Sequence, residues 1–244
     1  YIIALLYLAG EIPVTICKAG YLYIFDLSRN SFKGTIPSCL GDKNFKNSLS
    51  HFPNIFLMNL SKNQFQGTIP PSLCNATYLD VLDLSNNNLI GALPHCLGNV
   101  SISVLDLREN QIEGTLPPDF AKSCELTTFN MNNNHMEGSI PLTLANCESL
   151  QILDLGNNNI SDTFPLWLAN LPDLQIVVLR SNRLHGKLSV NNIDHPFPEL
   201  RIMDLSHNQF NGNLPINFFN NFKGMANSDQ YVGFNANKTG GPYY

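Results

Sequence analysis

The chain has 244 residues, a formal net charge of −5 and 14% charged residues. This length allows one large domain or two ordinary ones, and the acidic balance with no Lys/Arg cluster argues against nucleic-acid binding. No apolar run reaches the roughly 18 residues that a membrane span requires.

One motif of the form L-x-L-x-x-N-x-L-x-G-x-I-P recurs along the chain. The first segment, Tyr1–Ala9, is interpreted as a degenerate copy rather than a targeting remnant, because the stretch Gly10–Pro13 is in phase with the later copies. Clear copies then begin at Phe25, Met58, Leu82, Leu105, Phe129, Leu153, Val177 and Met203. Their asparagines are separated by 33, 24, 23, 24, 24, 24 and 26 residues, and they are Asn30, Asn63, Asn87, Asn110, Asn134, Asn158, Asn182 and Asn208.

The motif predicts one short strand in each copy, because the two apolar residues of L-x-L alternate with an outward-facing residue. The asparagine can donate and accept hydrogen bonds, so we expect a buried ladder that satisfies the backbone of adjacent turns. Gly then permits a sharp bend and Pro fixes φ. A period near 24 residues is typical of leucine-rich repeats, whereas a β-propeller needs longer repeats. The strict phase of the copies also argues against disorder.

The sequence therefore predicts a leucine-rich-repeat solenoid. We expect a right-handed superhelix of about nine repeats, with a parallel β-sheet on its concave face and irregular or 3-10 turns on its convex face. Residues 1–222 are assigned to this solenoid, uncapped at both ends, and residues 223–244 leave the repeat phase. Because exposed solenoid ends require polar caps, we expect the sequence to be a fragment of a longer protein.

The repeat form resembles the plant extracellular class of leucine-rich repeats over residues 1–222. Stretches beginning at Ser72, Leu144 and Glu199 are similar to the last repeats of plant receptor-like proteins of the Cf and Verticillium-resistance type. In that family a non-repeat island follows, which residues 223–244 would begin. The resemblance implies a membrane-anchored immune ectodomain in the apoplast. Such an ectodomain binds an extracellular, often pathogen-derived protein, peptide or glycan and signals through partner receptor kinases with leucine-rich repeats.

The cysteines lie at recurrent offsets from the asparagines, and equivalent points on adjacent turns are roughly 5 Å apart, within disulfide range. We predict the pairs Cys17–Cys39, Cys74–Cys96 and Cys124–Cys147, with six buried free thiols as the alternative. Disulfides would favour a secreted protein. So would the five N-glycosylation sequons, which begin at Asn59, Asn75, Asn99, Asn159 and Asn237.

Outward positions near each strand are predicted to form a recognition surface. The position four before each ladder asparagine gives a mostly acidic column, made of Asp26, Asn59, Asp83, Asp106, Asn130, Asp154, Val178 and Asp204. The two positions just before the asparagine vary more, as rigidly held recognition residues would. The predicted ligand-binding residues are Arg108, Glu109, Asp154, Arg180, Arg201, Asp204 and His207. For each, the alternative is a plain solvated side chain, and the column aspartates can also bond to a neighbouring serine.

Catalysis has little support, because the histidines are scattered and no catalytic motif is present. Asp83 and Asp106 would lie on adjacent strands, but we expect an open sheet to offer no desolvated pocket that separates their pKa values. We therefore expect no enzyme, no cofactor, no metal, and no membrane contact by this segment itself. Two other functions stay open: an inhibitor that resembles the polygalacturonase-inhibiting proteins, and the ectodomain of a peptide- or steroid-sensing receptor kinase.

Overall fold

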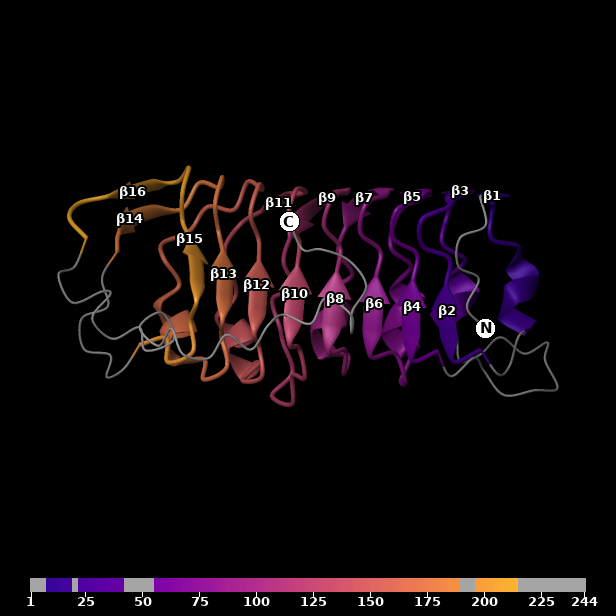
Figure 1. Ribbon diagram of the computed structural model, residues 1–244, viewed down its shortest axis with the longest axis horizontal. Helices are drawn as coiled ribbons and strands as arrows, with labels where there is room; N and C mark the ends of the chain where they lie inside the picture. The colour runs from indigo at the N-terminus through magenta and orange to yellow at the C-terminus, as the bar shows by residue number, and fades with distance from the viewer. Residues whose placement is uncertain (1–7, 19–21, 42–54, 189–195, 215–244) are drawn as a thin grey trace.

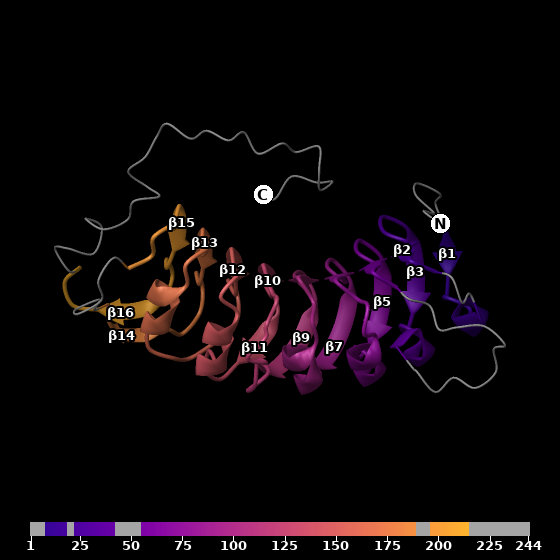
Figure 2. The ribbon, with the colours of Figure 1, turned by 90° about the horizontal axis from the view of Figure 1, so that it is seen from below.

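The computed structural model describes residues 8–18, 22–41, 55–188 and 196–214. These residues form an arc of stacked turns, with one parallel sheet on the inner face and short helical turns on the outer face (Figures 1 and 2). The predicted solenoid is confirmed in these features. Residues 223–244, the Asn237 sequon and most of Tyr1–Ala9 lie outside the described residues.

The concave sheet contains one three-residue strand from each turn, and neighbouring turns pair in parallel and in register. The middle residue of each strand points inward, and Met58, Leu82 and Phe129 are fully buried there. This alternation is what L-x-L requires of a strand with one buried face. The strands are β2 Ile24–Asp26, β4 Leu57–Asn59, β6 Val81–Asp83, β8 Val104–Asp106, β10 Thr128–Asn130, β12 Ile152–Asp154, β13 Ile176–Val178 and β15 Ile202–Asp204.

A second parallel sheet, which the sequence analysis did not predict, lies along one flank of the arc. Its strands are β1 Ala9–Gly10, β3 Ser31–Gly34, β5 Gln64–Gly67, β7 Asn88–Ala92, β9 Gln111–Thr115 and β11 His135–Glu137. The glycine of the motif is needed here. Gly91 has φ +77°, and an added Cβ would lie 2.9 Å from Cγ2 of Thr68 in the preceding turn. The backbone therefore takes a left-handed conformation at a close contact that a side chain would obstruct.

The flanking sheet is interrupted where Asp162 replaces the expected glycine. The Asp162 carboxylate accepts hydrogen bonds from the N–H groups of Ile140 and Thr163, at 3.0 and 2.7 Å. A side chain thus satisfies a backbone N–H of the preceding turn. Past this point the pairing resumes as an isolated bridge between Thr163 and His185. A separate two-stranded sheet then forms from β14 His185–Lys187 and β16 Gln209–Asn211.

The convex side consists of 3-10 turns, each of which follows a proline. Proline fixes φ and requires no backbone donor, so it suits the start of a helical turn. The predicted convex turns are therefore confirmed. They are η1 Val14–Lys18, η2 Ser38–Gly41, η3 Pro71–Asn75, η4 His95–Asn99, η5 Leu142–Asn146 and η6 Leu166–Asn170.

A ladder of buried asparagine side chains joins adjacent turns, and Asn110 shows its geometry. The Asn110 Nδ2 donates to the carbonyls of Leu107 and Arg108 in its own turn, and to Leu84 in the preceding turn, at 3.1–3.2 Å. Its Oδ1 accepts the N–H of Leu89 at 3.1 Å. Each amide therefore satisfies four buried backbone groups. The same four contacts recur at Asn63, Asn87, Asn134, Asn158, Asn182 and Asn208, and Asn30 accepts from Leu8.

Three disulfides link neighbouring convex turns. They join Cys17 to Cys39, Cys74 to Cys96 and Cys124 to Cys147, with Cα–Cα distances of 5.9, 5.8 and 4.6 Å. Each closes a loop of one repeat, with sequence separations of 22, 22 and 23. Among the residues that the structure describes, none of the cysteines is free. The same residues include no helix with the length and apolar character of a membrane span.

We expect removal of the Cys74–Cys96 disulfide to lower the free energy of unfolding by about 3 kcal/mol, because its loop of roughly 22 residues then gains chain entropy when unfolded. Both cysteines are only partly buried, so changing them to alanine leaves little cavity. Urea unfolding of the Cys74→Ala/Cys96→Ala variant, followed by circular dichroism, measures this loss. The wild type with its disulfides reduced is the control, and it should lose more than the variant does. A change below about 1 kcal/mol would contradict the prediction.

Candidate functional site

The concave sheet exposes two rows of side chains, because the first and third residue of every strand point outward. The first positions form an almost entirely aliphatic row, which we call the apolar lane. Strand register places its members side by side on consecutive turns, and the sequence analysis did not single them out. They are Ile24, Leu57, Val81, Val104, Thr128, Ile152, Ile176 and Ile202. A continuous, partly exposed apolar strip is a feature of binding surfaces.

A stacked aromatic pair, of which Tyr23 is exposed and Phe56 is half-buried, lies at one end of this lane. The rings of Tyr23 and Phe56 stack with centroids 5.2 Å apart, and Tyr23 is 55% exposed. They directly precede Ile24 and Leu57 in the sequence, so they extend the apolar lane at its β2–β4 end. Aromatic side chains offer large contact area with few rotatable bonds, which suits them to recognition.

The third strand positions form the polar column, in the order predicted, from Asp26 to Asp204. Each polar member closes the turn that follows its strand, since its Oδ1 accepts the N–H two residues later. Such Asx-type bonds are the reason that Asp and Asn are favoured there. One side-chain oxygen of every polar member is therefore used in a hydrogen bond within its own turn. The contacts of the other side-chain polar atom differ from turn to turn.

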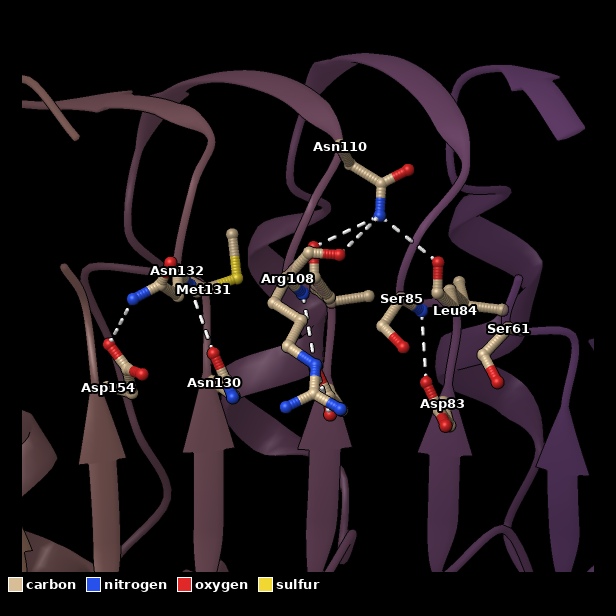
Figure 3. A network of polar contacts seen from close by, with 12 residues as sticks. Ser61, Asp83, Leu84, Ser85, Arg108, Asn110, Asn130, Met131, Asn132 and Asp154 are labelled. Atoms are coloured by element: carbon tan, nitrogen blue, oxygen red, sulfur yellow. Dashed lines mark hydrogen bonds and ion pairs between the residues drawn. The ribbon is translucent and has the colours of Figure 1, made fainter. Parts of the chain in front are cut away.

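Asp106 is the most buried carboxylate of the column, at 4% exposed. Its Oδ1 accepts the Arg108 N–H at 3.2 Å, and its Oδ2 lies 3.5 Å from Arg108 Nε. Burial, helped by the charge of Asp83 on the adjacent strand, raises the pKa of Asp106 to about 7, and the Arg108 charge and backbone hydrogen bond only partly oppose this. The expectation that an open sheet desolvates no carboxylate is therefore wrong at this residue. Figure 3 shows the Arg108 side chain extending back along its own strand, between Asp83 and Asn130.

Asp154 belongs to a second part of the same network. Its Oδ1 accepts a hydrogen bond of 2.9 Å from Asn132 Nδ2 on the preceding turn (Figure 3). Burial raises the pKa of Asp154, against the hydrogen bonds from Asn132 and Gly156. Asn132 also accepts from Asn157 at 3.2 Å. Asn132 thus joins its own turn to the turn of Asp154 through two direct side-chain bonds.

Asp204 differs because it is more exposed. Burial is the largest single effect and raises its pKa, but hydrogen bonds from Ser206 and the charges of Arg180 and His207 together outweigh it, and the net pKa is lowered. Arg180 Nη1 lies 3.7 Å from Asp204 Oδ2. Arg201 is exposed one residue before β15, and its N–H donates to the Gln175 carbonyl at 2.8 Å. Arg180, Asp204 and His207 therefore come together on the last described turns, and Arg201 lies on the same turn, three residues before Asp204. Arg108 and Glu109 lie several turns away.

The position just before each ladder asparagine is not on a strand, contrary to the expectation for the variable positions. The strands end at the polar column, and the next residues form a turn in which this position has φ between 52° and 57°. Left-handed backbone is costly for residues other than Gly, Asn and Asp. Glu109 and His207 occupy such positions and are exposed. The Glu109 carboxylate accepts a hydrogen bond from Asn133, the equivalent residue of the next turn.

The sequons lie on different faces. Asn59 is part of β4 and of the polar column, where its Oδ1 accepts from the N–H and hydroxyl of Ser61. Asn75 and Asn99 are exposed and end the convex turns η3 and η4. Asn159 lies on the flank, where its Oδ1 accepts from Arg183 at 3.2 Å. Among the described residues, no three His, Cys, Asp or Glu side chains gather as a metal ion would require.

Comparison with known families identifies leucine-rich repeats over most of the chain. A leucine-rich-repeat pattern matches residues 21–42, 54–76, 78–100 and 101–123. A two-copy pattern of the same repeat matches residues 124–167, and a third matches residues 148–210. No curated protein sequence matches the chain.

Among solved structures, plant receptors share this fold. The Arabidopsis receptor kinase HAESA ectodomain, in complex with an extended IDA peptide hormone, is 29% identical with a TM-score of 0.71. The plant peptide hormone receptor RGFR1 in complex with RGF2 is 28% identical with a TM-score of 0.69, and a TDR receptor is 28% identical with a TM-score of 0.70. Each alignment covers 85% of this chain but only 33–38% of the receptor, so the chain spans about a third of their length. A plant ice-binding protein at 24% identity, TM-score 0.62, covering 85% of this chain and 71% of its own, shows the fold alone.

Proposed function

The chain is a leucine-rich-repeat protein with the fold of plant extracellular receptors, and from this we propose that it is the ligand-recognition segment of a cell-surface receptor ectodomain. The observation that carries the proposal is the concave face. There, an apolar lane and a polar column run in parallel across the eight strands of the concave sheet, with exposed charged residues on some of the turns. The likeness at 28–29% identity to receptors solved with peptide hormones supports it.

The ligand that best fits this face is an extended peptide lying along the arc, across the strands. Strands are about 4.8 Å apart, so the eight strands of the concave sheet span about 34 Å, the length of about ten extended residues. Apolar ligand side chains would pack on the aromatic pair and the apolar lane. Acidic ligand groups would pair with Arg180, Arg201 and His207 at the other end.

For the finer assignment, we propose a receptor-like protein of plant immunity on the extracellular side of the plasma membrane, glycosylated at its exposed sequons. It would bind a pathogen-derived ligand and signal through partner receptor kinases. The three sequence stretches that resemble the Cf and Verticillium-resistance class support this assignment. A second candidate is the ectodomain of a peptide-sensing receptor kinase, which the likeness to HAESA favours. The coding sequence downstream separates them, because a kinase domain would identify the second and a short tail after an anchor the first.

The peptide proposal is tested by charge reversal. Twelve-residue peptides are selected from a displayed random library on the secreted chain, and their affinities are measured for the wild type and for Arg180→Glu/Arg201→Glu. We expect a loss of at least about tenfold, since each reversal replaces an attraction with a repulsion. Lys122→Glu, an exposed charge reversal away from the concave strands, is the matched control and should change affinity less than about twofold. Equal losses in both variants, or none in either, would overturn the proposal.

A further inference from the structure

We propose that Asp106 is a proton-controlled positioning residue for Arg108. In this proposal, ionised Asp106 holds the guanidinium against the concave sheet, and protonated Asp106 releases it to pair with an acidic group of a ligand. The inference rests on the proposed function, because it concerns the regulation of the same surface.

The geometry places one charged group directly under the other. Asp106 is 4% exposed, whereas the Arg108 side chain is 27% exposed, so solvent reaches the arginine far more readily than the carboxylate. The two are joined through both carboxylate oxygens, by the backbone bond of 3.2 Å and by the contact of 3.5 Å to Nε. Protonating Asp106 would leave the backbone bond in place but remove the negative charge that directly contacts the side chain, while Asp154, two strands away, would still attract the guanidinium.

The groups around Asp106 decide its protonation. Asp83 faces it from β6 on one side, with Cα atoms in register, and the neutral Asn130 faces it from β10 on the other. The charge of Asp154, on β12 beyond β10, also raises the pKa of Asp106. Among the charges that shift this pKa, Arg108 is the one cation, and it favours the ionised form. Because burial and two like charges oppose one cation, the pKa is raised to about 7, so the proton is exchanged close to neutral pH.

A second pair in the same chain provides an internal contrast. Arg180 occupies the position equivalent to Arg108, and its partner Asp204 belongs to the same column. The Asp204 side chain is 33% exposed, and its pKa is lowered. Asp204 therefore stays ionised throughout the range in which Asp106 titrates. Of the two arginines, only Arg108 is expected to lose its partner's charge near neutral pH.

The test is a nuclear magnetic resonance titration of the labelled 244-residue chain without ligand, from about pH 5 to about pH 9. It records the carboxyl carbon of Asp106 and the Nε signals of Arg108 and Arg180. We expect the Asp106 carbon and the Arg108 Nε to shift with one shared midpoint near the raised pKa, about 7, while the Arg180 Nε stays constant.

Asp106→Asn supplies the matched variant, because Asn59 and Asn130 already make the same backbone bond at equivalent positions. In this variant the Arg108 Nε shift should disappear, and the spectrum of the remaining chain reports that it is folded. An Asp106 midpoint below about 5, or an Arg108 signal that stays constant while Asp106 titrates, would overturn the inference. No ligand enters the experiment, so its outcome is independent of whether the peptide proposal holds.

Discussion

Replacing Asn87 with alanine is expected to lower the free energy of unfolding by about 3–5 kcal/mol. Its amide donates to the carbonyls of Leu60, Leu84 and Ser85 and accepts the N–H of Phe65, and it is 7% exposed. Alanine leaves these backbone groups buried without a partner, and each unsatisfied group costs about 1–3 kcal/mol. Urea unfolding measured by circular dichroism and by Trp167 fluorescence gives the change.

The adjacent residue is the natural control for this substitution. Asn88 is exposed in β7, so Asn88→Ala changes the same residue type one position away without removing the ladder amide. We expect it to change stability by less than about 1 kcal/mol. If the two variants lost similar amounts, the ladder would not be a main source of stability.

The free energy of unfolding, measured as a function of pH, should show the raised pKa of Asp106 as a contribution that falls with rising pH. In the folded chain the carboxyl keeps its proton up to about pH 7, whereas the ordinary value is 3.8. Between these values the unfolded state has released the proton and the folded state has not, so its contribution to stability falls as pH rises and levels off above about pH 7. At about 1.4 kcal/mol per pH unit, the loss in the free energy of unfolding is on the order of 4 kcal/mol.

Asp106→Asn should remove this loss. The free energy of unfolding of the variant should therefore rise relative to that of the wild type from about pH 4 to about pH 7. Asp204→Asn is the opposite control. The pKa of Asp204 is lowered, so its contribution is present above the ordinary value and is lost as pH falls. Parallel pH curves for the wild type and Asp106→Asn would show that the carboxyl is not desolvated in the folded chain.

The sequence was sufficient to predict the concave strands and the positions of the ladder asparagines, because both depend on contacts that recur in every turn. The flanking sheet was missed, although a signal was present. In Gln64–Phe65–Gln66 an apolar residue lies between two polar ones directly after a ladder asparagine, which is the alternation of a second strand. The sequence analysis interpreted the glycine of the motif only as a bend, whereas it also lets adjacent turns approach each other.

The burial of Asp106 could not be predicted from its own position in the repeat. Asp83 and Asp154 occupy equivalent positions and are only partly buried. The difference lies two residues later, where Ser85 and Gly156 follow those aspartates but the long side chain of Arg108 follows Asp106. Such a difference in burial depends on how the side chains of one turn pack against its neighbours. A repeat motif describes what the turns have in common and so does not predict this difference.

The left-handed residue before each ladder asparagine limits how this surface can diversify. Valine, isoleucine and threonine carry a branched Cβ that such a backbone excludes more strongly than other side chains. Fewer residue types are therefore tolerated at positions such as Glu109, Ser181 and His207, both in natural variants and in a combinatorial library. New specificities should arise mainly at the strand residues and at the residue two before the asparagine, where the backbone is not left-handed.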